Sequence, residues 1–300
     1  QYGSFTVLAE NNRTQMQGLI EELAKAENQP GSIAQKVGDL YNIAMDSVKL
    51  NADGVKPIQA EMEEINALTD KSQLYAFLPS LAQRGIGGYL GLYVGADEKN
   101  AQMNAVQIGQ SGLSMGERDY YLAEDEATTK IREAFRAHVV KMMQLAGYDD
   151  ATATRTRDIV MDVETRLAKA FRSRVELRDP QANYNKMTVD ELKKQYPTFG
   201  WDAYFAAFGL QDTKEVIVGQ PASLAEAAKI LDTLPLDQQK LYLQWKLVDA
   251  SASCLSDALN EQNFDFYSRT MSGQKEQQPR WKRAVSTVSG VLGEAVGQMY

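Results

Sequence analysis

The chain has 300 residues, of which 44% are hydrophobic and 24% charged, and this composition excludes a disordered chain. Its net charge of −8 and its pI near 4.9 argue against nucleic acid as a partner, because proteins that bind nucleic acid carry basic patches. No apolar run approaches the roughly 20 residues of a membrane-spanning helix. The single cysteine, Cys254, excludes an intrachain disulfide.

Helical patterns fill most of the first ninety residues. The pattern S-x-x-Q at 32–35 is a capping box, and it predicts a helix that continues through Val48. Apolar spacing predicts two further helices, over 58–68 and 71–81.

The segment that follows breaks the helical pattern and then gives way to further helices. Its two short β-prone pieces, 89–94 and 105–108, predict a hairpin. Helical spacing returns in the residues 131–142, 159–170 and 241–259, and a second capping box, T-x-x-E, stands at 188–191. We therefore expect a mainly α, multi-helix fold, a single domain over 1–300 with one short β-hairpin near 89–108.

The last stretch, 279–300, predicts one amphipathic helix that runs to the end of the sequence. Its apolar residues recur at helical spacing: Trp281, Val285, Val288, Leu292, Val296 and Met299. No capping glycine, proline or polar tail ends this pattern. The pattern alone leaves open whether the protein ends here or the sequence is one part of a longer chain.

No catalytic or metal-binding constellation is visible in the sequence. Zinc sites draw mainly on Cys and His, and this chain has one of each. His138 lies on the apolar face of the helix expected over 131–142, so we expect a packed histidine. Cys254 falls on the stripe 241–259 and is expected to be a small core residue.

The most unusual piece is MGERDYYLAED at 115–125, where Arg, Asp and adjacent tyrosines follow a glycine-rich turn. Two interpretations are open. The tyrosines could anchor the turn in the core with their hydroxyls at its edge. Alternatively, the charged and phenolic groups could bind a ligand.

The stretch QSGLSMGERDYYL at 110–122 resembles the GL-x-x-x-x-RDYYL signature in the non-catalytic half of the neprilysin/endothelin-converting-enzyme family of zinc metallopeptidases. Further stretches resemble the family in the same order: YGSF (2–5), RDPQANYNKMTVDEL (178–192), FGWDAYF (199–205), LYLQWKLVDASASCL (241–255), FDFYSRTMSG (264–273) and RWKRAVSTVSGVLGEAVGQMY (280–300). The resemblance therefore covers the sequence essentially from end to end.

This resemblance implies the N-terminal lid and substrate-chamber half of a zinc-dependent metalloendopeptidase that hydrolyses oligopeptides. The family's His-Glu-x-x-His helix and the later Glu that completes its zinc site are absent from this sequence. The resemblance thus implies zinc as the cofactor of the intact enzyme, bound by a C-terminal catalytic half that is this chain's partner. It implies no catalytic or metal-binding residue within the chain, and an inactive fragment.

Two substrate-binding residues follow from the family's start motif, Arg-Tyr-Gly-x-Phe-Asp, which here reads QYGSFT. The resemblance implies that Phe5 is a wall of the pocket just after the cut. Gln1 stands where the family's Arg holds a substrate's C-terminal carboxylate, and a neutral amide cannot form that charged pair. We therefore expect endopeptidase action without a strong preference for a free C-terminus.

Ala284 stands where extracellular animal members have a cysteine, which indicates a bacterial member. Such enzymes are commonly exported, so we expect the periplasm, the cell envelope or the extracellular space. The alternative from a different functional class is a stand-alone acidic α-helical protein that serves as a binding module or scaffold without catalysis.

Overall fold

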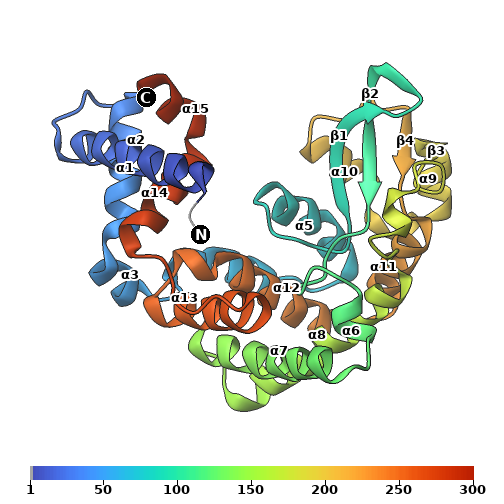
Figure 1. The fold of residues 1–300 in the computed structure, drawn as a ribbon. Helices are drawn as coiled ribbons and strands as arrows, with labels where there is room; N and C mark the ends of the chain where they lie inside the picture. Colours follow the sequence, from blue (N-terminus) through green and yellow to red (C-terminus); the bar gives the residue numbers. More distant parts are fainter. Residues whose placement is uncertain (1–2) are drawn as a thin grey trace. The chain divides into compact units, whose positions relative to one another are not determined.

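The computed structural model describes residues 3–300 and is mainly α-helical with one small sheet, which confirms the expected fold class (Figure 1). Contacts along the chain divide it into two compact units. Unit 1 comprises Gln1–Gly54, Cys254–Asp257 and Gly273–Tyr300, and unit 2 comprises Val55–Ser253 and Ala258–Ser272. The single domain over 1–300 stays a prediction.

Unit 1 is a small bundle held by an apolar core. Its helices are α1 (Ser4–Lys25), α2 (Ile33–Met45), α3 (Ser47–Asp53), α14 (Arg280–Val291) and α15 (Gly293–Met299). Helices α1, α2 and α14 pack on one another through Ile20, Val37 and Val288, none of which has exposed surface. Val285, Val288 and Val296 of the final apolar stripe are therefore buried within unit 1 itself.

Two predicted helices of unit 1 are each divided in the structure. The Ser32 side chain caps α2 by accepting a hydrogen bond of 3.1 Å from the Gln35 amide, but the helix ends before Val48. There Asp46 caps α3 in turn, and this new start breaks the helix. The helix expected over 279–300 breaks at Leu292, which has a φ of −123°. Gly290 and Gly293 lie close to this break and explain it, because glycine lowers helix propensity.

The four-stranded sheet of unit 2 contains the expected hairpin and two strands that the sequence pattern did not predict. Its strands are β1 (Gly91–Asp97), β2 (Asn100–Gly109), β3 (Asn185–Thr188) and β4 (Glu215–Val218), in the order β1-β2-β4-β3. Neighbouring strands pair antiparallel except β2 and β4, which are parallel. The hairpin is thus joined to the rest of unit 2 through β4.

Helices make up the remainder of unit 2. They are α4 (Gln59–Asn66), α5 (Lys71–Gln83), α6 (Asp119–Leu122), α7 (Glu126–Leu145), α8 (Asp150–Ala170), α9 (Val189–Gln195), α10 (Trp201–Ala207), α11 (Pro221–Thr233), α12 (Leu236–Ser251) and most of α13 (Asp257–Phe264), which continues as a π-helical segment over Asp265–Thr270. Helices α7, α8 and α12 pack against one another (Figure 1), and the capping box at Thr188–Glu191 opens α9 as predicted.

The stripe 241–259 does not lie on one helix. Helix α12 ends at Ser251 and a 3-10 turn, Ala252–Cys254, separates it from α13. Cys254 is exposed, so the expectation of a core cysteine was wrong. The reason is that the helical spacing on which it rested no longer applies once the chain leaves α12. Within α12, residues 242–248 are buried on every side, so this helix has no solvent-facing stripe.

Candidate functional site

Phe5, the substrate-binding residue expected from the sequence, lies in the first turn of α1. Its side chain is 87% exposed, and Leu8 three residues later is 56% exposed. Residues three apart share one face of a helix, so the two side chains form a small apolar surface at the start of α1. Gln1 lies outside the described residues. The roles of both residues stay predictions.

Tyr121 of the RDYY stretch and Ser114 before it bond to a buried carboxylate, that of Glu164 on α8. One Glu164 oxygen accepts hydrogen bonds from the Ser114 amide, at 3.0 Å, and from the Tyr121 hydroxyl. The other accepts from the Ser114 hydroxyl at 2.7 Å. Glu164 has no exposed surface, and its charge is therefore stabilised by these hydrogen bonds in place of water.

Helix α12 completes this cluster with Lys246 and Tyr242. The Lys246 ammonium donates to the Gly112 carbonyl at 2.7 Å and lies 3.4 Å from Glu164, forming a buried ion pair. The Tyr242 hydroxyl lies 3.3 Å from the same carboxylate. Burial, reinforced by the negative charge of Glu164, raises the pKa of Tyr121 and of Tyr242 well above that of free tyrosine. Both hydroxyls therefore stay protonated and act as donors.

Two arginines of this region donate hydrogen bonds to main-chain carbonyls. Arg118 donates to the Phe171 carbonyl at 2.9 Å, and Arg132 donates to the Tyr120 carbonyl at 2.9 Å. The stretch 115–125 is therefore fixed to neighbouring segments by hydrogen bonds, which favours the interpretation as a structural anchor. Sequence reasoning missed Glu164, although an acidic residue between the apolar positions Val163 and Leu167 of an amphipathic helix was an available signal.

Gly112 allows the loop before this stretch to approach closely. It has a φ of +108°, a conformation that favours glycine, and an added Cβ atom would lie 2.2 Å from the Gly88 carbonyl oxygen. The glycine is thus required where the loop carries Ser114 to the buried carboxylate.

His138 is packed among aromatic rings, as expected. It is 1% exposed, and its ring stacks on Phe266 with a centroid separation of 4.8 Å. Its Nδ1 lies 3.1 Å from the amide nitrogen of Gln262. Burial lowers the pKa of His138 to about 3, so the imidazole is neutral at physiological pH.

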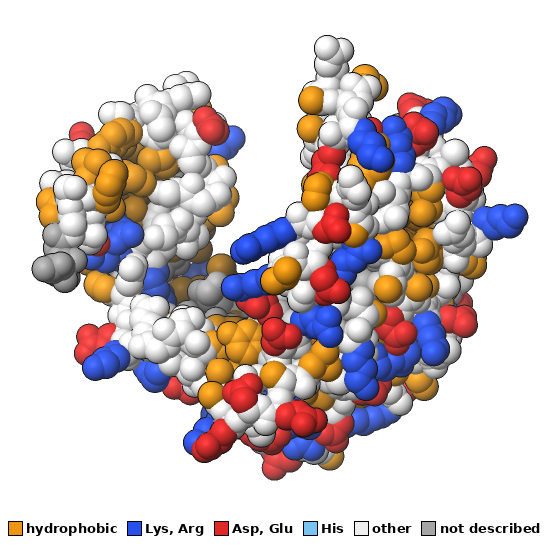
Figure 2. Space-filling model, turned by 45° about the vertical axis from the view of Figure 1, so that its right-hand side comes forward, with side chains coloured by type: hydrophobic (Ala, Val, Ile, Leu, Met, Phe, Trp, Pro, Cys, Tyr) orange, Lys and Arg blue, Asp and Glu red, His pale blue; other side chains and the backbone are white. Residues whose placement is uncertain are grey.

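The described residues offer no metal site, no membrane-spanning helix and, on one face, no excess of either charge. Within residues 3–300 no group of three or more His, Cys, Asp or Glu side chains is placed to hold a metal ion. No helix in this part of the chain combines the length and the apolar character needed to cross a membrane. On the face seen in Figure 2, acidic and basic side chains are interspersed, so neither sign of charge dominates there.

A family model described as Peptidase family M13 matches residues 1–300. The chain belongs to peptidase family M13. The matching model is that of the family's N-terminal region, which confirms the resemblance seen in the sequence.

Curated relatives of the chain include endothelin-converting enzyme 1 of Rattus norvegicus, at 26% identity over all of this chain and 40% of the relative. Neprilysin-11 of Caenorhabditis elegans is 24% identical over all of this chain and 38% of its own length. The chain therefore spans well under half the length of the curated relatives it matches.

Solved structures also match all of this chain with less than half of their own length. The zinc metalloprotease Zmp1 of Mycobacterium tuberculosis, in complex with an inhibitor, matches all of this chain and 46% of its own, with a TM-score of 0.93 and 32% identity. PepO from Lactobacillus rhamnosis matches all of this chain and 47% of its own, with a TM-score of 0.82. Its identity of 20% shows a shared fold alone.

Replacing Glu164 by glutamine tests the anchor. The substitution leaves the Lys246 ammonium buried without its partner charge, so we expect the free energy of unfolding to fall by about 3–5 kcal/mol in urea denaturation. The matched control is Glu226→Gln, because Glu226 pairs with Arg166 at 2.9 Å where both side chains are about a quarter exposed. That loss should stay below about 1 kcal/mol. Equal small losses in the two variants would contradict the anchor.

Proposed function

We propose that the chain is the N-terminal, non-catalytic half of a zinc-dependent metalloendopeptidase that hydrolyses oligopeptides. The observation that carries the proposal is the family match over residues 1–300, combined with relatives that extend to more than twice this length. Relatives named as a converting enzyme and a zinc metalloprotease support the reaction class. No comparison favours a stand-alone binding protein or scaffold.

The zinc ion of this enzyme would be held by residues outside the chain. The donor set within 3–300 does not fit such a site, because no group of candidate ligands converges there and His138 is enclosed by aromatic rings. The proposed role of this chain is therefore to bind its own C-terminal catalytic half. Together the two halves enclose the chamber in which an oligopeptide lies.

Phe5 is proposed as an apolar wall for the substrate residue just after the cut. Its 87% exposure in this structure leaves the ring available for contact with a peptide or with the catalytic half. Gln1 is proposed to face the substrate without providing a positive charge. The intact protein is then an endopeptidase that does not require a free C-terminal carboxylate.

The source and location complete the proposal. Ala284, in place of a family cysteine, and a single cysteine in the whole chain favour a bacterial protein that needs no disulfide set. Export to the periplasm, the cell envelope or the extracellular space is proposed on the same basis.

The first test compares the full gene product with residues 1–300 alone. The intact protein should contain one equivalent of zinc by elemental analysis and should hydrolyse an oligopeptide, with the hydrolysis abolished by a chelator. Residues 1–300 alone should contain no stoichiometric zinc and hydrolyse nothing. Peptidase activity in the pure fragment would place the reaction within this chain and contradict the proposal.

The role of Gln1 is tested with a peptide prepared as the free acid and as the C-terminal amide. Since glutamine makes no ion pair with a carboxylate, kcat/KM of the intact enzyme should differ between the two by less than about threefold. Gln1→Arg should introduce a preference for the free acid of about tenfold or more, through a charge-assisted bond. A strong preference already present in the unaltered enzyme would rule out this role.

The role of Phe5 is tested by Phe5→Ala in the intact enzyme. Loss of an apolar wall should raise KM about tenfold for peptides with a large apolar residue after the cut, and less for peptides with a small one there. Val48→Ala is the control, because Val48 on α3 is 80% exposed and has no proposed contact with substrate. If both variants behave like the unaltered enzyme, Phe5 does not line the pocket.

A further inference from the structure

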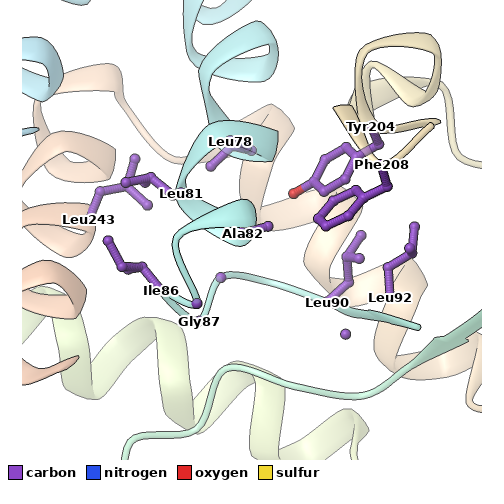
Figure 3. A pocket seen from close by; sticks show the side chains of 13 residues that line it. Leu78, Leu81, Ala82, Ile86, Gly87, Leu90, Leu92, Tyr204, Phe208 and Leu243 are labelled. Atoms are coloured by element: carbon purple, nitrogen blue, oxygen red, sulfur yellow. The ribbon is translucent and has the colours of Figure 1, made fainter. Parts of the chain in front are cut away.

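Unit 2 contains an apolar cavity that the proposed peptidase function does not use. It has a volume of about 210 Å³ and lies between α5, the loop 85–92 and α10 (Figure 3). Leu78 and Leu81 of α5, Ile86 of the loop and Leu243 of α12 form a buried apolar lining, each less than 10% exposed. The cavity is larger than an engineered apolar cavity of about 150 Å³ that binds benzene.

Among the residues that line the cavity, only Tyr204 has a polar side-chain atom. Figure 3 shows Tyr204 extending from α10 toward Ala82 of α5, with its hydroxyl oxygen directed into the space between them. Tyr204 is 4% exposed, and its hydroxyl makes no hydrogen bond to another residue within 3–300. The hydroxyl oxygen is not among the fully buried side-chain atoms without a partner, so it is in contact with the open space of the cavity. This hydroxyl is therefore available to a molecule in the cavity.

The mouth of the cavity is built from small or exposed residues. Gly85 and Gly87 are exposed at its edge, and a Cβ atom added to Gly85 would meet nothing within 4 Å. Phe208, at the end of α10, is 36% exposed and lies beside Tyr204 (Figure 3). A small molecule thus has a route past the glycine loop to the leucine lining.

We propose that this cavity is a binding site for a small apolar molecule of one or two rings that carries a single hydrogen-bonding group. The leucine and isoleucine lining contacts the rings, and the Tyr204 hydroxyl forms the one directional bond. The volume favours a free small molecule over a polypeptide segment, which would need a longer groove. Binding fills a space whose lining otherwise lacks dispersion contacts on one side.

The test uses indole and indene as probes, since they share a shape and only indole has an N–H group. Isothermal titration calorimetry on the intact protein should give saturable binding of indole with a dissociation constant of about 0.1–1 mM. Indene should bind about 2- to 10-fold more weakly, because it cannot bond to Tyr204. Tyr204→Phe should remove this difference while retaining the binding of indene.

Ala82→Leu fills the cavity from α5 and should abolish the binding of both probes. The matched control, Ala60→Leu, makes the same change at an exposed position of α4 away from the cavity and should leave binding unchanged. Absence of indole binding to the unaltered protein, or equal binding to the Ala82→Leu variant, would overturn the proposal. Since calorimetry measures binding and not hydrolysis, these outcomes are independent of the peptidase proposal.

Discussion

The position of the RDYY region depends on one charge, the buried carboxylate of Glu164. A carboxylate without contact to water must find donors within the protein, and here they come from several parts of the sequence. Ser114 arrives from the loop after β2, Tyr121 from α6, and Lys246 from α12. Because each donor must reach the same two oxygen atoms, a single side chain on α8 fixes the arrangement of three other segments.

The sequence predicted those features that depend on local chemistry. Capping residues such as Ser32 and Thr188 bond within one helical turn, so they mark helix starts correctly.

The breaks within the predicted helices were harder to predict. An apolar stripe continues across Leu292 even though the helix does not, since the core there accepts apolar residues from either helix. Strands β3 and β4 are four residues each, and their pairing is decided by distant partners rather than by their own pattern.

The functional assignment had a different origin. Residues 3–300 contain no group of metal ligands, and the burial of His138 and the main-chain hydrogen bond of Arg118 are explained by stability alone. The resemblance of ordered stretches supplied the family, which the match over 1–300 confirmed. Phe5 could be proposed as a site residue only through that resemblance, because exposure of one phenylalanine on a helix is compatible with many roles.

The composition of unit 1 has a consequence for the order of events during synthesis. Its core joins Ile20 and Val37, near the start of the chain, to Val288, near the end, whereas unit 2 takes all its residues from between them. During synthesis on a ribosome, α1 and α2 emerge before α14. Their apolar faces stay exposed until α14 has also been synthesised. Unit 2 can meanwhile complete its own core. The long sequence separation of the contacts in unit 1 thus makes it the slower unit to assemble and the one in greater need of protection from aggregation.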